Sequence, residues 1–222
     1  MNRRSFLQNA AVGVGAGVCG TAWPKLFWAA ASESTVAIRL ENFPLRKQET
    51  PYTCGPAAAR MVLEYLGHPV PEAEIKKRFG TNPVIGTSNG QELRGLNRYL
   101  AEFKLGLAAK MLKGEAVTNE VVRQSLEARL PVLASFLTEN FFKPGTEVGH
   151  YSVIIGFDPS ADEFTLANPF GYLAQVNTAQ FWRLAEWRPK PGDLPAGVKH
   201  AKGLPIPLKR TIIVLEKAGS RS

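Results

Sequence analysis

The chain is poor in cysteine and histidine, and these shortages limit the chemistry open to it. It has 222 residues but only 2 cysteines and 3 histidines. No cluster of His, Cys, Asp and Glu residues has the spacing of a metal site, so we expect neither a metal nor a cofactor. Basic residues are scattered and are not interleaved with aromatic ones, a pattern that argues against nucleic acid as a partner.

Acidic residues are missing from residues 1–31. This segment has an arginine pair within residues 3–8, a mildly apolar Gly/Ala/Val run over residues 10–20, and small residues at its end. It predicts an export signal, and residues 3–8 resemble a twin-arginine signal, which implies passage of the folded protein through the twin-arginine export machinery. The apolar run is shorter than the roughly 20 strongly apolar residues of a membrane anchor, so we expect no stable membrane insertion after signal removal.

The rest of the chain, residues 32–222, is long enough to bury a core and is most simply one domain. A Pro/Gly-rich stretch over residues 188–208 predicts an irregular excursion, either on the surface or over the site. Without the signal, 24 of the 27 basic residues remain against 19 acidic ones, a mild excess of positive charge. We expect a monomer that is periplasmic or secreted.

The cysteine count is the most informative feature of the composition. Cys19 lies in the predicted signal, so Cys54 is the one cysteine of the exported chain and has no intramolecular partner. Cysteines in an oxidising compartment are usually paired. A single one is therefore either buried and inert or retained for its chemistry.

Cys54 stands where a helix is predicted to begin. Met61, Val62 and Tyr65 recur at helical spacing after it, and Pro56 fits a first helical turn. The unpaired N–H groups and the positive end of the helix dipole at such a position favour thiolate over thiol, so we expect a lowered pKa. Six residues upstream, Gln48 is close enough for its amide to converge with the Cys54 N–H as an oxyanion hole.

A candidate base lies at His150, at the start of a β-forming run, where a cleft can reach a strand end. Asn168 ends the next strand of the expected hairpin, and its amide could accept the imidazole Nδ1–H and present Nε2 to the sulfur. Asp158 is a competing third member, although it stands in a predicted turn. His68 follows a predicted helix end and His200 lies in the irregular stretch, so both are expected to be ordinary surface residues.

The order of helices and strands indicates an α+β fold, because the helical patterns come first and the β-rich runs second. Helices are predicted over residues 57–66, 71–79, from Ser88 or Asn89 onward, 118–129 and 178–187. Strands are predicted over residues 131–137, 150–157, 163–167, 172–176 and 210–215, and they are expected to form an antiparallel sheet.

Several segments together resemble the C39 and C39-like cysteine peptidase family, in its freestanding form. They are Gln48, the Thr-Cys-Gly-Pro-Ala segment around Cys54, the Gly-His-Tyr-Ser-Val segment around His150, and Asn168 with the following proline. The resemblance covers residues 48–187 and implies a papain-like fold with N-terminal helices packed on an antiparallel sheet. It implies that Cys54 is the nucleophile, His150 the general base, Asn168 the orienting residue and Gln48 the oxyanion donor.

Two departures from the family pattern are present. Many relatives have aspartate where this chain has Thr53 and where it has Asn168. An asparagine can orient an imidazole but adds no charge to stabilise an imidazolium, so we expect either a weaker base or a resting thiolate–imidazolium ion pair that is less populated than usual.

The sequence thus predicts an exported cysteine hydrolase that cleaves a peptide or amide bond through a thiol acyl-enzyme. Two alternatives stay open: a papain-like acyltransferase that hands the acyl group to an amine or thiol, and a catalytically silent module that only binds a peptide. The loop over residues 138–149, ahead of His150, is expected to contact the substrate.

Overall fold

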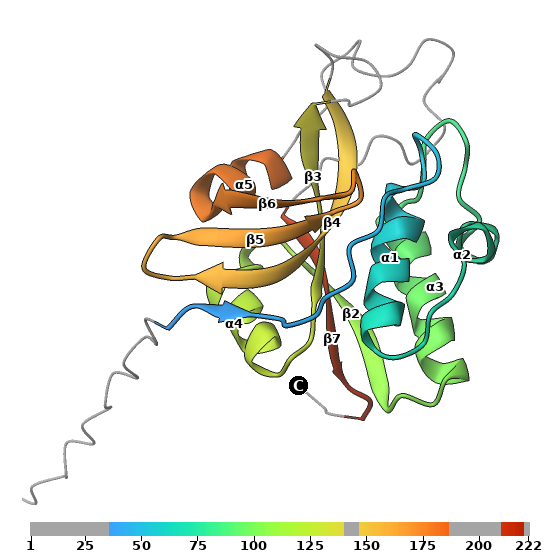
Figure 1. The fold of residues 1–222 in the computed structure, drawn as a ribbon, viewed down its shortest axis with the longest axis horizontal. Coiled ribbons are helices and arrows are strands. Elements are labelled where there is room, and N and C mark those ends of the chain that lie inside the picture. The colour runs from blue at the N-terminus through green and yellow to red at the C-terminus, as the bar shows by residue number, and fades with distance from the viewer. Residues whose placement is uncertain (1–35, 140–146, 187–209, 220–222) are drawn as a thin grey trace, which may run out of the picture. The chain divides into compact units, whose positions relative to one another are not determined.

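A seven-stranded antiparallel sheet lies at the centre of the described part of the chain (Figure 1). The computed structural model describes residues 36–139, 147–186 and 210–219, all within the unit Ser34–Ser222. The strands follow the order β2-β7-β3-β4-β5-β6, and β1 pairs with β4. They are β1 (Ile38–Arg39), β2 (Leu107–Lys113), β3 (Val132–Glu139), β4 (Glu147–Asp158), β5 (Glu163–Asn168), β6 (Tyr172–Asn177) and β7 (Thr211–Lys217).

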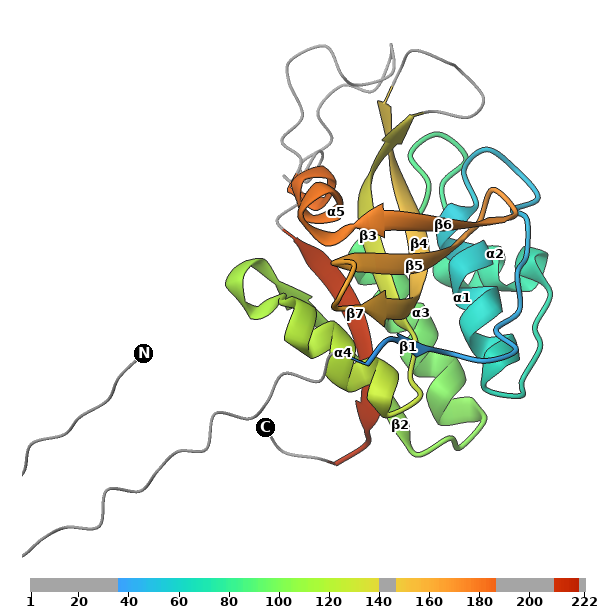
Figure 2. The ribbon, with the colours of Figure 1, turned by 60° about the vertical axis from the view of Figure 1, so that its left-hand side comes forward.

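Five α-helices in the described residues accompany the sheet. They are α1 (Cys54–Tyr65), α2 (Glu72–Phe79), α3 (Asn89–Glu102), α4 (Asn119–Glu127) and α5 (Thr178–Ala185), with a short 3-10 helix at Gly114–Ala116. Figures 1 and 2 show α1, α2 and α3 gathered on one side of the sheet and α4 and α5 on the other. None of the helices in these described ranges is long and apolar enough to cross a membrane.

Helix α1 is a core helix that packs on β4. It begins at Cys54 because the Ala57 N–H donates to the Thr53 carbonyl oxygen at 2.9 Å, which closes the first turn. Its first two turns contain three consecutive alanines, Ala57, Ala58 and Ala59, all fully buried. Small side chains on this segment let the helix backbone approach its neighbours closely, and this fixes where the Cys54 sulfur lies.

Helix α3 begins with a capping box at Ser88. The Ser88 hydroxyl accepts from the Gln91 N–H, and the Gln91 side chain accepts from the Ser88 N–H. The two contacts satisfy two donors that a helix start otherwise leaves unpaired. The predicted helix start at Ser88 or Asn89 is confirmed.

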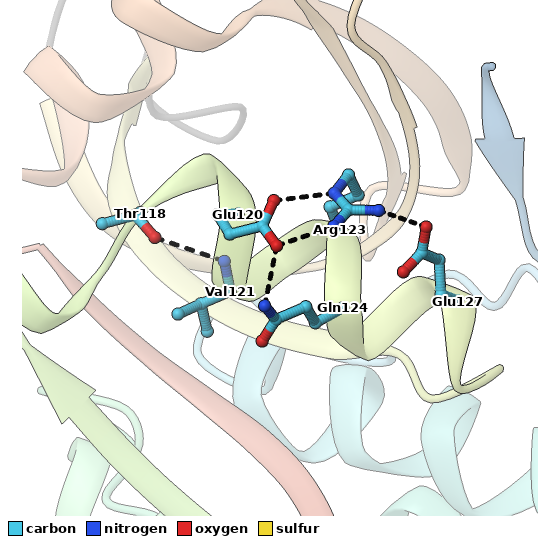
Figure 3. A network of polar contacts seen from close by, with 6 residues as sticks. All are labelled: Thr118, Glu120, Val121, Arg123, Gln124 and Glu127. Carbon is cyan, nitrogen blue, oxygen red and sulfur yellow. Dashed lines mark hydrogen bonds and ion pairs between the residues drawn. The ribbon is translucent and has the colours of Figure 1, made fainter. Parts of the chain in front are cut away.

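Helix α4 carries a network of surface charges (Figure 3). Thr118 caps its first turn. Arg123 donates to both oxygens of Glu120 at 2.7 Å and also binds Glu127, while Gln124 donates to Glu120 at 2.7 Å. Every carboxylate of this helix therefore has a partner at the protein surface.

The predicted α+β fold with an antiparallel sheet is confirmed, and each predicted helix and strand is found with bounds that differ by a few residues. Strands β1 and β2 were not predicted. Strand β2 is a half-buried edge strand, so its apolar alternation is weak. It is fixed by a tertiary contact, because the Asn97 side chain bonds both the N–H and the carbonyl oxygen of Ala109, at 2.8 and 2.9 Å.

Some predictions fall outside the described residues. These are the signal at residues 1–31, most of the loop over residues 138–149, the excursion over residues 188–208, and the expected end of the last helix at Trp187. They stay predictions.

Candidate active site

Cys54 is the first residue of α1, and its thiol is almost completely buried, with 9 % of the residue exposed. The backbone N–H of Tyr151, the residue that follows His150 in β4, lies close enough to the sulfur to lower its pKa. Sequence positions almost a hundred residues apart are therefore neighbours here. The thiol is free, in the sense that no disulfide involves it.

The expected lowering of the thiol pKa is wrong for the free protein. Burial is the largest influence and raises the pKa of Cys54 to about 11, with a further upward contribution from the charge of Glu92. The N–H groups of Tyr151, Gly55 and Cys54 itself act in the expected direction and lower it. The helix start does favour the thiolate, but the loss of hydration on burial is the larger effect.

His150 and Asn168 form a buried hydrogen bond, with 2.9 Å between imidazole Nε2 and amide Oδ1. The same Oδ1 accepts the Phe170 N–H at 2.9 Å, which identifies it as the oxygen of the amide. An oxygen acceptor requires that Nε2 carry the ring hydrogen. Nδ1 is then the unprotonated nitrogen and the basic one.

This arrangement corrects the predicted tautomer, which had Nδ1 bonded to Asn168 and Nε2 directed to the sulfur. At this end of strands β4 and β5, the last paired residues are Val153 and Ala167. His150 and Asn168 lie beyond this pair, and they are diagonal to each other instead of directly opposite. Because of this diagonal, the ring reaches the amide with Nε2, the nitrogen farther from its own backbone.

Aromatic side chains enclose the imidazole of His150. Phe170 stacks on it with ring centroids 4.2 Å apart, and Phe136 meets it edge-on at 5.8 Å. Burial lowers the pKa of His150 to about 4, and the hydrogen bond to Asn168 opposes this only in part. The ring is therefore neutral at pH values well above about 4, and it is able to accept a proton there.

Gln48 joins the region before α1 to the loop after β5. Its backbone N–H donates to the Pro169 carbonyl oxygen at 2.7 Å, directly after Asn168. Its buried side-chain Nε2 donates to the Thr50 carbonyl oxygen at 2.6 Å, while Oε1 has no hydrogen-bond partner among the described residues. One N–H of the amide is used by Thr50, and the second is the one that could serve an oxyanion.

Asp158 and His68 have contacts of their own outside this site. Asp158 accepts hydrogen bonds from the N–H groups of Ser160 and Ala161 and from the Ser160 hydroxyl, which closes the turn after β4. His68 stacks on Phe103 at 4.5 Å. His200 lies outside the described residues. Asn168, not Asp158, is the residue that contacts His150.

One buried ionisable residue of this region was not identified from the sequence. Glu92 of α3 is 0 % exposed, and neither of its carboxyl oxygens has a hydrogen-bond partner in the described residues. A weak signal was present, because Glu92 is spaced four and seven residues before Leu96 and Tyr99 on the apolar face of α3. A carboxyl in that stripe has to be buried.

Within the residues that the structure describes, no set of three or more His, Cys, Asp or Glu side chains is placed to hold a metal ion.

Comparison with known proteins agrees with the fold. Three solved structures share the fold of papain-like cysteine peptidases with this chain. The peptidase domain of Streptococcus ComA, a bi-functional ABC transporter involved in quorum sensing, is 15% identical with a TM-score of 0.50, over 78% of this chain and 97% of that one. A protein described as a C39-like peptidase from Bacillus anthracis is 18% identical with a TM-score of 0.52, over 67% and 92%.

The third structure is a double glycine motif protease from an AMS/PCAT transporter, solved with its leader peptide. It is 16% identical with a TM-score of 0.51, over 81% of this chain and 94% of that one. The family described as Peptidase_C39 like matches residues 40–188, and the chain belongs to that family. No curated protein matches it.

Proposed function

We propose that this protein is a cysteine hydrolase that cleaves a peptide or amide bond through a thioester at Cys54. The observation that carries the proposal is the buried 2.9 Å hydrogen bond between His150 and Asn168. The next residue after His150 is Tyr151, whose backbone N–H lies close enough to the Cys54 sulfur to lower its pKa. A nucleophile, a base and a group that orients the base are the parts that such chemistry requires.

The first half of the reaction starts from a neutral thiol and a neutral imidazole. The raised pKa of Cys54 and the lowered pKa of His150 support this starting state. As the sulfur attacks the carbonyl carbon, Nδ1 of His150 takes the thiol proton. The carbonyl oxygen becomes an oxyanion that accepts from the Cys54 N–H and from Nε2 of Gln48.

Collapse of the oxyanion breaks the carbon–nitrogen bond. The protonated Nδ1 of His150 gives its proton to the departing amine, and the acyl group stays on the sulfur as a thioester. Nδ1 then takes a proton from water, whose oxygen attacks the thioester carbon, and the acid leaves while the thiol regains its proton. Throughout, Asn168 holds the ring through Nε2 without adding charge.

Peptides are the proposed substrates, and export is part of the proposal. The twin-arginine-like residues 3–8 favour a periplasmic or secreted location. The protein is proposed to be a monomer. One structural relative is a double glycine motif protease solved in complex with its leader peptide, which supports a peptide as the substrate of this chain.

One observation favours a second candidate, a silent peptide-binding module. A thiol with a pKa of about 11 is less reactive than the activated thiols of many cysteine enzymes. Acyl transfer to an amine would use the same residues as hydrolysis, and the acceptor alone separates the two.

Cleavage of a peptide pool tests the proposal. The full chain, Cys54→Ala and His150→Ala would each be incubated with peptides digested from a bacterial proteome, with and without glycinamide as an acceptor. We expect new carboxyl termini with the unaltered chain, none with either variant, and amidated ends only if the protein is a transferase. Equal cleavage by Cys54→Ala, or no cleavage by the unaltered chain, would overturn the proposal. Glu127→Gln, on exposed α4, is the matched control.

A further inference from the structure

The carboxyl group of Glu92 lies under the first turn of α1 and has no role in the steps above. A Cβ atom added at Gly55 would stand 2.6 Å from Glu92 Oε2 and 3.0 Å from Thr87 Cβ. The carboxyl therefore lies against the backbone of the residue next to Cys54. It is fully buried, and neither oxygen has a hydrogen-bond partner among the described residues.

Two other ionisable groups face this carboxyl, and both become anions when they lose a proton. Cys54 faces it from α1, and Tyr151 faces it from β4, since charge on Glu92 acts on both. The Tyr151 hydroxyl also donates to Asn89, in the first turn of α3. Cys54, Glu92 and Tyr151 thus form a buried cluster of three acids.

Among the other elements packed on α3, α2 brings the buried Glu72 near the start of α1, where it accepts the Glu49 N–H at 2.9 Å. The charge of Glu72 is not among the causes that shift the pKa of Glu92. Other charged groups lie farther along α3. From α2, Glu74 accepts from the Tyr99 hydroxyl and Arg78 binds Glu102, both near the far end of α3. On β2, Lys110 pairs with Glu216 of β7. Burial is the one cause that shifts the pKa of Glu92, and it raises that pKa to about 8.

We propose that Glu92 is a positioning residue for the nucleophile, because its protonated carboxyl supports the backbone at Gly55. With that carboxyl neutral, the sulfur of Cys54 is the one group of the buried cluster that becomes negative during the reaction. This inference rests on the proposed function for its role in catalysis. A carboxylate in the same place would oppose the thiolate by charge repulsion in a dry environment.

Coupled titration gives the inference a measurable consequence. Below the pKa of Glu92, the thiolate fraction of Cys54 rises about tenfold for each pH unit. At pH values above the pKa of Glu92, most molecules have an ionised Glu92 and a neutral Cys54 thiol. The charge of ionised Glu92 makes the thiolate harder to form, so above about pH 8 the thiolate fraction falls below the line extrapolated from lower pH.

Alkylation of Cys54 by iodoacetamide tests this without any substrate. The rate would be measured on the full chain from about pH 6 to about pH 10, with the adduct assigned to Cys54 by peptide mapping. We expect the rate of the unaltered chain to rise less steeply above about pH 8, while Glu92→Gln keeps its slope and reacts up to roughly tenfold faster near about pH 9 to 10. Glu102→Gln, an exposed change on the same helix, should behave as the unaltered chain.

A rate that rises by the same factor for each pH unit through about pH 8 in the unaltered chain would overturn the inference, whether or not Glu92→Gln folds. If Cys54 proves inert to alkylation, the infrared carbonyl band of a protonated carboxyl decides: it should be present at neutral pH and vanish at alkaline pH, and its absence at neutral pH would overturn the inference. If the alkylation rate changes slope near about pH 8 but no peptide is cleaved, only the proposed function is overturned. If peptides are cleaved but the alkylation rate shows no change of slope, only the role of Glu92 is overturned.

Discussion

The carboxylates of α4 and the carboxyl of α3 show two ways in which this protein handles acidic side chains. On α4, Glu120 and Glu127 share Arg123 at the surface, in contact with water (Figure 3). On α3, Glu92 is buried without a partner. Burial without a partner penalises the charged form, whereas exposure and pairing preserve it.

Charge therefore has little effect on the surface of α4 and a large effect in the buried region beside Cys54. An exposed ion pair is screened by water and salt and contributes little. In the buried cluster of Cys54, Glu92 and Tyr151, each added charge acts on its neighbours with little screening. Substitutions in the two regions should therefore have very different effects.

The largest effect is expected at the nucleophile and the base. Cys54→Ala and His150→Ala should each reduce peptide cleavage by about 1000-fold or more, because each removes a group that the chemistry cannot replace. Cleavage rates on a peptide found in the pool experiment would measure this. Circular dichroism spectra that match the unaltered chain would show that the fold is kept, and a loss of less than tenfold in either variant would contradict the assignment.

The pH dependence of stability comes next. A carboxyl with a pKa of about 8 when folded and an ordinary pKa when unfolded binds its proton more tightly in the folded state. Its contribution is complete at pH below the unfolded value and is lost as pH rises towards about 8. The free energy of unfolding should thus fall by a few kcal/mol over this window, and Glu92→Gln should remove most of the fall.

Urea unfolding at several pH values would measure that slope. His150, whose pKa is lowered to about 4, acts in the opposite sense, because its contribution is lost as pH falls below its ordinary value. The comparison is therefore cleanest between the ordinary pKa of histidine and about pH 8. Equal slopes in the unaltered chain and Glu92→Gln would show that Glu92 is not the buried acid.

A smaller loss is expected from Gly55→Ala. The added methyl group would stand 2.6 Å from Glu92 Oε2, so helix α1 or the carboxyl has to move, at a cost of about 1 to 3 kcal/mol. The matched control is Gly90→Ala in the first turn of α3, where the new Cβ meets only the mobile end of Arg94 at 3.3 Å. Urea midpoints would measure both, and equal midpoints would contradict the close contact at Gly55.

The smallest effect is expected on α4. Glu127→Gln removes one exposed carboxylate of the Arg123 network and should change the free energy of unfolding by less than about 0.5 kcal/mol, with cleavage unchanged. Urea unfolding at low and high salt would measure this. A loss comparable to that of Gly55→Ala would show that the surface network matters more than its exposure indicates.

Local patterns in the sequence were enough to predict most elements of the fold. The helical spacing after Cys54, the cap at Ser88 and the β-rich runs are each short-range signals, and each led to the right element. Strand β2 carries little of that signal and is fixed by Asn97, a contact that forms only in the folded chain.

The site was harder to predict because its properties depend on burial and register. The contact of His150 with Asn168 followed from their places on neighbouring strands, but the nitrogen that makes it depends on a diagonal that the sequence does not show. The direction of the Cys54 pKa shift was wrong, because the depth of burial outweighs the helix start. Glu92 was passed over for the same reason.

The acid-quenched reaction of the full chain with a cleaved peptide tests the central claim most directly. Mass spectrometry of the quenched protein should show the acyl part of the peptide attached to Cys54, and the adduct should be missing from His150→Ala. Cleavage that proceeds in the unaltered chain with no acyl adduct at Cys54 at any quench time, or with an adduct elsewhere, would contradict the claim.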